Sequence, residues 1–451
     1  MPCLRCKVYN PRMTQPEIAS GIPAVYAERR ARLAQLMQRG VAVVPTAPEQ
    51  ARNRDSHYPY RYDSYFYYLT GFPEPEAVLV LVAGDPGRSI LFCRDKDAER
   101  EIWDGFRYGL DQARAEFRVD ESHSISEFDS LLPKLLADQP ALHCHLGSDG
   151  RWDERVLSAL NAVRAQARTG VTAPAAIYDV RALLDEMRLL KDAHELDIMR
   201  RAAQISTDAH RRAMCAVKPG RAEYEIEAEL LHEFRRRGAQ APAYTSIVAG
   251  GANACVLHYV SNDAVLNAGD LLLVDAGCEL DGYAADITRT YPVSGRFTPA
   301  QRDVYQMVLA AQAAAIAAVH PGAAWTAPHD AALRVLAQGL IDFGLCQGSV
   351  DKVLEAGDYK RFYMHRTGHW LGLDVHDAGD YKRDGQWREL KPGMVLTVEP
   401  GCYIRGDDVP RQFANIGIRI EDDVLVTASG KEVLTHAAPK TVEDVEALMR
   451  G

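Results

Sequence analysis

The chain of 451 residues is 47% hydrophobic and 25% charged, a composition typical of a soluble globular protein, and its length predicts two or three domains. The formal net charge of -10 disfavours a generic binder of nucleic acid or of an anionic membrane. No apolar run approaches the roughly 20 residues that cross a bilayer, and the N-terminal stretch lacks the apolar segment of a signal peptide. We therefore expect a cytoplasmic protein with no nucleic-acid or membrane partner.

Nine cysteines, an odd number without regular spacing, do not indicate a disulfide framework. Cys3 and Cys6 have the spacing of half a zinc knuckle, but no second pair accompanies them, and their role stays open. His143, Cys144 and His145 also resemble metal ligands, although alternating burial in a strand explains them better.

The first 182 residues carry a mixed pattern of helices and strands. We expect strands over residues 41–44, 77–82, 89–93 and 141–146, and helices over 24–39, 126–138 and 152–167. Eight aromatic residues between positions 58 and 72 partly alternate, which favours a strand that forms a core wall over a substrate or subunit surface. Together these elements predict a mixed α/β domain, residues 1–182, with a connection near residues 177–181.

From residue 183 onward, long helices separate short strands. Helical periodicity covers residues 183–217, 223–236, 303–319 and 328–343, and the first of these helices ends at Lys218-Pro219-Gly220. Strands are expected within residues 242–256. We therefore predict an α+β domain, residues 183–451, with helices outside a curved antiparallel sheet.

Two acidic residues stand out within apolar strand patterns. The run from Leu271 to Val274 predicts a buried strand that ends at Asp275. A turn at residues 279–282 then leads into a second expected strand, residues 283–291, which carries Asp286 across a hairpin from Asp275. Because an isolated buried carboxylate costs several kcal/mol, the pair indicates a bound cation.

The same pattern occurs a second time. Residues 267–277 read NAGDLLLVDAG and residues 391–401 read KPGMVLTVEPG, so that Glu399 corresponds to Asp275. The second copy is also followed by an expected strand, residues 416–426, with Glu421 in its middle. This internal similarity predicts a duplicated unit in which four carboxylates converge. His369 is a fifth candidate, between Gly368 and Gly372, which allow close backbone approach.

Two aspartates, two glutamates and one histidine form a hard ligand set. Such a set suits Mn²⁺, Mg²⁺, Co²⁺ or Fe²⁺ better than a structural zinc site made of thiolates. Four carboxylates are too many for one divalent ion but balance two, which can share a hydroxide and polarise a carbonyl. The expected chemistry is metal-assisted hydrolysis.

The five residues, in the contexts DAG, ADITRT, HRTGHWLGLDVHD, TVEPG and IRIED, resemble the metal ligands of the pita-bread metallopeptidases. Within that superfamily the chain is similar to the Xaa-Pro aminopeptidases (aminopeptidase P), and the likeness extends over nearly the whole chain, including residues 54–77. The resemblance implies a pita-bread C-terminal domain and cleavage of the N-terminal Xaa-Pro bond of peptides through a hydroxide that bridges two divalent ions, with Mn²⁺ favoured.

The resemblance also implies a role for each candidate residue. Asp286 and Glu421 would bridge both ions, Asp275 would chelate one, and His369 and Glu399 would hold the other. Glu399 would also handle the proton of the attacking hydroxide. The remaining implied residues are three catalytic histidines that orient the scissile carbonyl or donate to its oxyanion, and an arginine that locks a ligand carboxylate from behind: His258, His365, His376 and Arg419.

The N-terminal domain is implied to serve oligomerisation and substrate access. Trp103 lies among charged residues, where burial and an inter-subunit contact are both open, and it matches a position that reaches a neighbouring subunit's active site in oligomeric family members. The resemblance accordingly suggests a homodimer or a homotetramer.

Three functions remain to be separated. An aminopeptidase would cut peptides with proline in the second position, whereas a prolidase would demand the free proline carboxylate of a dipeptide. Arg383 and Arg388, in the loop of residues 380–390, are candidates to bind such a carboxylate. A non-catalytic pita-bread binding protein is disfavoured, because the whole ligand set is present.

Overall fold

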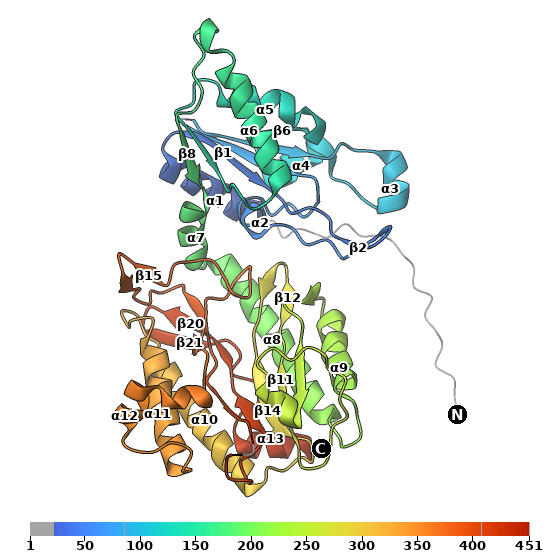
Figure 1. The fold of residues 1–451 in the computed structure, drawn as a ribbon. Coiled ribbons are helices and arrows are strands. Elements are labelled where there is room, and N and C mark those ends of the chain that lie inside the picture. Colours follow the sequence, from blue (N-terminus) through green and yellow to red (C-terminus); the bar gives the residue numbers. More distant parts are fainter. Residues whose placement is uncertain (1–21, 85, 407, 451) are drawn as a thin grey trace, which may run out of the picture. The chain divides into compact units, whose positions relative to one another are not determined.

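The computed structural model describes residues 22–84, 86–406 and 408–450. The Cys3 and Cys6 pair lies outside the described residues. The chain forms two compact units, with the boundary between Arg181 and Ala182. Each unit is described by itself below (Figure 1).

The first unit is built on a six-stranded mixed sheet. The strand order is β6 (Glu121–Ser124), β5 (Arg88–Cys93), β4 (Val78–Ala83), β1 (Gly40–Pro45), β7 (Ala141–Cys144) and β8 (Ala176–Asp179). Its helices are α1 (Ile22–Met37), α2 (Ser64–Thr70), α3 (Ala98–Asp104), α4 (Gly109–Phe117), α5 (Phe128–Leu136) and α6 (Gly150–Arg164), and a short hairpin joins β2 (Ala51–Asn53) to β3 (Ser56–His57). β1 pairs antiparallel with β4 and parallel with β7, which makes the sheet mixed as predicted.

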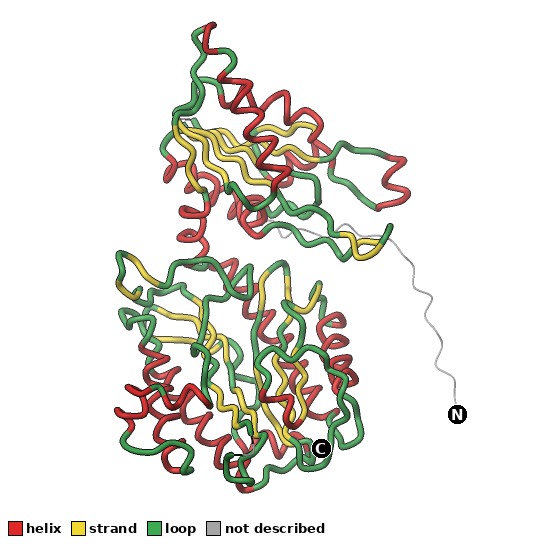
Figure 2. Tube along the Cα trace, in the orientation of Figure 1, coloured by secondary structure: helices red, strands yellow, loops and turns green. Residues whose placement is uncertain are grey.

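The core of this unit follows from the alternation of apolar side chains along the strands. Val41, Val43, Val78 and Val80 pack with residues of α5 and α6, such as Phe128, in one buried cluster. The intervening strand residues face the opposite side, which α1 and α4 cover, so helices lie on both faces of the sheet (Figure 2).

Two predictions for this unit are wrong. The aromatic segment contains helix α2 rather than a strand, because Asp63 accepts a hydrogen bond from the Phe66 amide at the helix N-terminus and Gly71, with φ 66°, ends the helix. Phe66 and Tyr68 are buried, but Tyr58 is 53% exposed, so only part of the segment forms a core wall. Within residues 177–181, predicted as a connection, residues 177–179 belong to the edge strand β8, which pairs parallel with β7.

The second unit contains seven helices within the described residues. They are α7 (Arg181–Leu189), α8 (Ala193–Ala216), α9 (Glu223–Arg236), α10 (Pro299–Ala317), α11 (Ala327–Asp342), α12 (Val350–Ala356) and α13 (Val442–Met449). The helix predicted over residues 183–217 is interrupted before Asp192, because Asp192 and Glu195 form a capping box that starts α8. Glu223–Arg236 is helical as predicted.

Short antiparallel strands form the centre of this unit. The sheets are β10 (Ile247–Gly250) with β11 (Leu271–Asp275) and β14 (Thr288–Pro292); β13 (Tyr283–Ala284) with β12 (Cys278–Leu280) and β9 (Ala241–Pro242); β17 (Val395–Val398) with β20 (Asp422–Thr427) and β21 (Gly430–Val433); β18 (Gly401–Ile404) with β19 (Ile416–Arg419); and β15 (Lys382–Arg383) with β16 (Gln386–Trp387). Helices α8 and α9 contact strands of the first half, and α10 contacts β17, β18 and β19 (Figure 1).

Both strands predicted to carry an acid in their middle are interrupted at that acid. Asp286 lies between β13 and β14, and Glu421 lies between β19 and β20. Thr288, rather than Asp286, is the residue opposite Asp275 in the β11–β14 register. The interruptions let each carboxylate leave the regular alternation of its strand, and they occur at matching places in the two halves.

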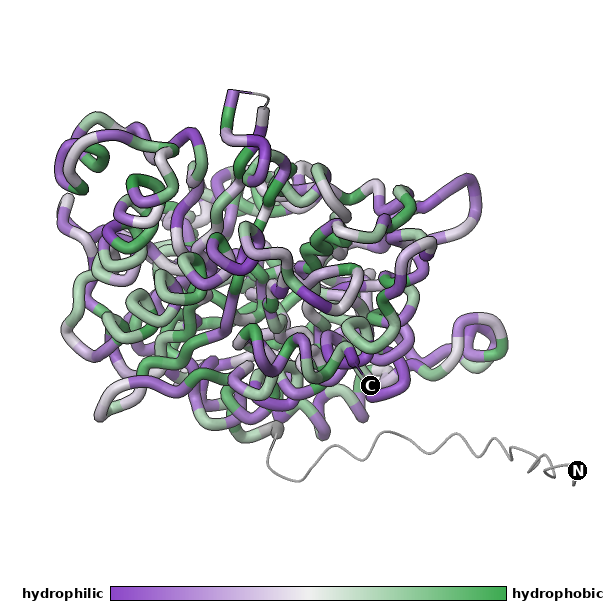
Figure 3. The backbone as a smooth tube through the Cα atoms, turned by 90° about the horizontal axis from the view of Figure 1, so that it is seen from below, coloured by the Kyte–Doolittle hydropathy of each residue, from purple (hydrophilic) through white to green (hydrophobic). Residues whose placement is uncertain are grey.

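Hydropathy along the chain agrees with the burial of these elements. Figure 3 shows hydrophilic stretches along the outer loops of the trace and hydrophobic stretches within the helices and strands. Among the described residues, no helix is long and apolar enough to cross a membrane.

We expect Gly277→Ala to destabilise the second unit severely. A Cβ at Gly277 would lie 1.7 Å from the carbonyl oxygen of Ala285, a backbone atom that moves only with the segment carrying Asp286. The free energy of unfolding should fall by about 3 kcal/mol or more, measured by urea denaturation. Gly150→Ala is the control, since a Cβ there has nothing within 4 Å; equal stability of the two variants would contradict the prediction.

Candidate metal centre and active site

A cavity of about 800 Å³ in the second unit brings the predicted site residues together. All five predicted metal ligands line it, and so do the predicted catalytic histidines and the supporting arginine: Asp275, Asp286, His369, Glu399, Glu421, His258, His365, His376 and Arg419. Of the predicted site residues, only Trp103 lies elsewhere, in helix α3 of the first unit, where its side chain is 79% exposed.

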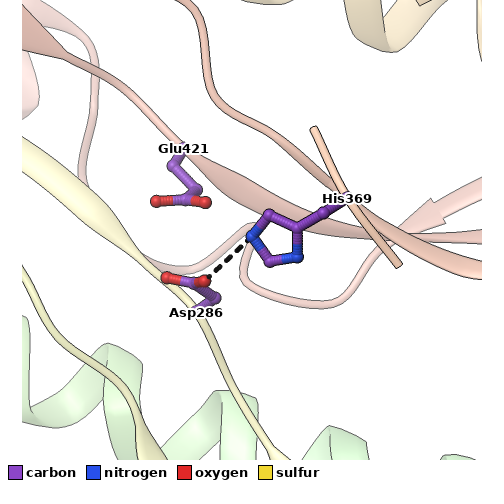
Figure 4. A group of neighbouring side chains, drawn as sticks. All are labelled: Asp286, His369 and Glu421. Carbon is purple, nitrogen blue, oxygen red and sulfur yellow. Dashed lines mark ion pairs between the residues drawn. The ribbon is translucent and has the colours of Figure 1, made fainter. Parts of the chain in front are cut away.

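Asp286, His369 and Glu421 form the tightest group of possible ligands. One ligand atom from each lies within 4.8 Å of the others, and the three side chains point toward one another (Figure 4). His369 Nε2 lies 3.5 Å from Asp286 Oδ2 and 3.8 Å from Glu399 Oε1. Its Nδ1 donates to the Trp370 carbonyl, 2.9 Å away, so Nε2 is the ring nitrogen that faces the carboxylates. In this orientation Nε2 can bind a metal ion once it has lost its proton.

Asp275 is held by two side chains that come from distant parts of the chain. Arg419 donates from Nη2 to Asp275 Oδ2 at 2.6 Å. The Tyr244 hydroxyl lies 2.6 Å from Asp275 Oδ1 and 2.5 Å from Asp286 Oδ1, so one proton is shared between two carboxylates. Both aspartates are thereby fixed in one orientation.

Glu399 and Glu421 are oriented by threonines. The Thr288 hydroxyl donates to Glu421 Oε2 at 2.5 Å and accepts from Arg419 Nε at 3.0 Å. The Thr397 hydroxyl donates to Glu399 Oε1 at 3.4 Å. The guanidinium of Arg419 thus donates both to Asp275 and to Thr288, and Thr288 in turn donates to Glu421.

The pKa values show how strongly the carboxylates interact. Burial, together with the neighbouring aspartates, raises the pKa of Glu399 to about 7 and that of Glu421 well above its usual range. Burial lowers the pKa of His369, but its hydrogen bond to Asp286 and the charge of Glu399 outweigh this and raise the pKa to about 9. Burial and mutual repulsion therefore disfavour the charged forms of Glu399 and Glu421.

The predicted catalytic histidines differ in their availability. His365 donates from Nδ1 to the Arg366 carbonyl at 2.7 Å, and its Nε2 lies 2.9 Å from the Tyr403 hydroxyl. Because Tyr403 receives a hydrogen bond from Arg419, its own proton goes to His365, and both nitrogens of His365 are engaged. His258 and His376 are exposed to the cavity and make no hydrogen bond to other described residues.

The two arginines considered as carboxylate binders are already paired. Arg388 donates from both terminal nitrogens to Glu186, at 3.1 and 2.5 Å, and Arg383 lies 2.9 Å from the same carboxylate. Neither lines the cavity. Arg366, which the motif analysis did not single out, is the guanidinium at the cavity wall besides Arg419.

Sequence reasoning also missed Tyr244, Thr288 and Tyr403. Thr288 is two residues after Asp286, so its position on the same strand face was a signal that could have been used. Tyr244 has no such signal, because it lies 31 residues from Asp275 and 42 from Asp286. Only the fold brings it to the carboxylates.

Comparisons with known proteins identify the family of the chain. The family model for metallopeptidase family M24 matches residues 197–428, and the model for the N-terminal domain of aminopeptidase P matches residues 26–143. The chain belongs to metallopeptidase family M24 and combines its catalytic domain with the aminopeptidase P N-terminal domain.

Individual relatives and solved structures narrow the class of metallopeptidase further. The Xaa-Pro aminopeptidase of Haemophilus influenzae is 46% identical over 94% of this chain and 96% of that protein, and that of Escherichia coli is 45% identical over 94% and 97%. Aminopeptidase PepP of Pseudomonas aeruginosa has a solved structure with a TM-score of 0.93 and 49% identity, covering 95% of this chain and 98% of that one. The structure of zinc-substituted Escherichia coli aminopeptidase P in complex with product matches with a TM-score of 0.93 and 44% identity, covering 95% of this chain and 98% of that one. The expected metallo-aminopeptidase of the Xaa-Pro class is confirmed.

We expect Arg419→Lys to weaken metal retention by about 10- to 100-fold, because lysine keeps the charge but cannot donate at once to Asp275, Thr288 and Tyr403. Metal content after dialysis against graded chelator, measured by elemental mass spectrometry, tests this. Arg361→Lys is the control, since Arg361 is exposed and pairs with Asp408. Retention equal to that of the control would contradict the assigned role of Arg419.

Proposed function

We propose that the chain cleaves the N-terminal Xaa-Pro bond of peptides with two divalent metal ions held by Asp275, Asp286, His369, Glu399 and Glu421. The observation that supports this most strongly is the convergence of four carboxylates, three of them buried and Glu399 partly buried, and one histidine on one cavity. The matching positions of Asp275 and Glu399, and of Asp286 and Glu421, further support a duplicated unit that supplies half the site from each copy.

The residues present fit two hard cations. The carboxylates are buried, yet Arg419 is the one guanidinium paired with them among the described residues. Burial, together with the charge of the neighbouring carboxylates, raises the pKa of Glu399 and of Glu421, so a bound cation would stabilise their charged forms. Oxygen ligands suit Mn²⁺, our proposed ion, and His369 completes the set through Nε2, which would lose its proton when the metal binds. When bound, two such ions lower the pKa of water and polarise a carbonyl.

The chain's own residues then divide the remaining work. Glu399 accepts the proton of the attacking water, a role that needs a carboxylate within hydrogen-bond reach of the nucleophile. His258 and His376 orient the scissile carbonyl and donate to the developing oxyanion, because their ring nitrogens are free to meet substrate. His365, with both nitrogens engaged, fixes Tyr403 and Arg419 instead.

Proline specificity has a physical basis in this setting. A proline nitrogen carries no hydrogen, so a peptidase that grips this residue through strand pairing loses a hydrogen bond, and a shaped pocket must replace it. Trp325, Tyr381 and Val375 provide apolar walls in the cavity. Its volume and the pairing of Arg383 and Arg388 with Glu186 favour an aminopeptidase over a prolidase.

We further propose a homodimer or homotetramer that forms through the first unit. Helix α3 buries none of its side chains, and Ile102 and Trp103 on it are 81% and 79% exposed. In this proposal the predicted N-terminal domain, residues 1–182, serves oligomerisation and substrate access, and Trp103 reaches the active site of a neighbouring copy. We also propose a cytoplasmic location, which agrees with the seven free cysteines among the described residues.

Asp286→Asn should abolish turnover while the protein stays folded. The amide has the size of the carboxylate but lacks its charge, so kcat should fall by at least about 100-fold. Chelation should abolish the activity of the wild type. Added Mn²⁺ should restore the activity of the wild type but not that of the variant. Asp351→Asn, at an aspartate whose side chain is 80% exposed, is the control. Near-normal activity of Asp286→Asn, with unchanged circular dichroism, would refute the two-metal site.

Product analysis separates aminopeptidase from prolidase. Mn²⁺-loaded protein should release glycine from Gly-Pro-Leu and longer Gly-Pro peptides, and mass spectrometry of the products should locate the cut between glycine and proline. Cleavage of Gly-Pro alone would instead assign a prolidase.

A further inference from the structure

The wall of the active-site cavity carries a cationic and aromatic cluster that the proposed chemistry does not use. Arg366 and Trp387 both line the cavity, and the Arg366 guanidinium carbon lies 5.5 Å from the centroid of the Trp387 ring. Lys382 Nζ lies 4.3 Å from the same centroid, and Lys382 is the residue opposite Trp387 in the β15–β16 hairpin. One indole ring therefore places two positive charges beside the cavity.

These two charges have no carboxylate partner in the part of the chain that the structure describes. Neither Arg366 nor Lys382 makes an ion pair there, and both side chains are exposed. By contrast, Arg383 and Arg388, which flank Trp387 in the same hairpin, are both paired with Glu186. Those pairs fix the hairpin, so Trp387 is held in place while Arg366 and Lys382 keep their charge available.

The cavity is lined by both signs of charge. Its lining includes four carboxylates, of which Asp275, Asp286 and Glu421 are buried, and the exposed Arg366, which therefore lies nearer to solvent. An aminopeptidase cuts one residue from the free amine, so the substrate ammonium must lie within one residue of the carboxylates. The part of the substrate that extends away from them is the part after proline, and a positive wall favours negative charge there.

We propose that Arg366, supported by Trp387 and Lys382, binds a carboxylate of the substrate located after the proline. The inference rests on the proposed Xaa-Pro cleavage and adds a preference within it. Two sources offer the same chemistry: the C-terminal carboxylate of a short peptide and an acidic side chain of a longer one. A planar guanidinium held against an indole ring can meet a carboxylate with two parallel hydrogen bonds.

Matched peptide pairs test the preference and distinguish the sources. Gly-Pro-Leu against Gly-Pro-Leu-amide tests the C-terminal carboxylate, and Gly-Pro-Glu-amide against Gly-Pro-Gln-amide tests an acidic side chain. We expect kcat/KM to be about two- to tenfold higher for the acid in at least one pair, the range of an exposed ion pair and of a charged hydrogen bond. The higher kcat/KM of the acid should arise from a lower KM, and the difference between acid and amide should shrink as the NaCl concentration rises.

Variants assign the effect to the cluster. Arg366→Gln should remove the acid preference and leave kcat/KM for the amide peptides unchanged. Trp387→Leu should weaken the preference, whereas Trp387→Phe, which keeps a ring, should retain most of it. Arg361→Gln is the control, because Arg361 also lies over a ring, that of Phe362 at 5.2 Å, but pairs with Asp408 and does not line the cavity.

Binding of the cleavage product gives a readout apart from turnover. Calorimetric titration should show tighter binding of Pro-Leu than of Pro-Leu-amide to the wild type and equal binding of the two to Arg366→Gln. Equal handling of acids and amides by the wild type, or an equal loss for both in Arg366→Gln, would overturn the inference even if Xaa-Pro cleavage is observed. Failure of all Gly-Pro peptides to be cut would instead overturn the proposed function.

Discussion

Four carboxylates line one cavity of the second unit, three of them buried and Glu399 partly buried, and their charges repel one another. Burial makes each of these charges costly. Arg419 offsets part of this cost, and hydroxyl groups from Tyr244 and Thr288 donate to three of the four carboxylates. Such an excess of negative charge suits divalent cations, which is the basis of the proposed metal site.

The backbone makes this convergence possible. Interruptions in two strands free Asp286 and Glu421 from strand alternation, and two glycines let neighbouring backbones touch behind the site. A Cβ at Gly277 would overlap the Ala285 carbonyl, and one at Gly368 would lie 2.1 Å from the Thr397 carbonyl. Both close contacts adjoin a ligand residue, Asp286 in the first case and His369 in the second. The ligand geometry is therefore set by backbone packing as well as by side chains.

The cavity brings opposite charges together. Its lining includes the four carboxylates, which in the proposed function hold two metal ions, and the exposed Arg366, which in our further proposal meets a carboxylate after the proline. Both ring nitrogens of His365 have hydrogen-bond partners, whereas His258 and His376 make no hydrogen bond to other described residues. The three histidines therefore differ in their surroundings, although their sequence contexts look equally catalytic.

The sequence alone determined the ligand types, because acids that end apolar strands before glycine are a local and repeated pattern, and His369 lies in a motif of close glycines. It also determined the long helices, such as Glu223–Arg236, from periodicity. Tertiary structure decided the rest. The cap at Asp63 starts helix α2 where the aromatic pattern predicted a strand. Only the fold brings Tyr244 to Asp275 and shows that Asp275 is the carboxylate that Arg419 holds. Periodicity reports which face of an element is buried, but not which distant side chain meets it, since that depends on how the elements pack.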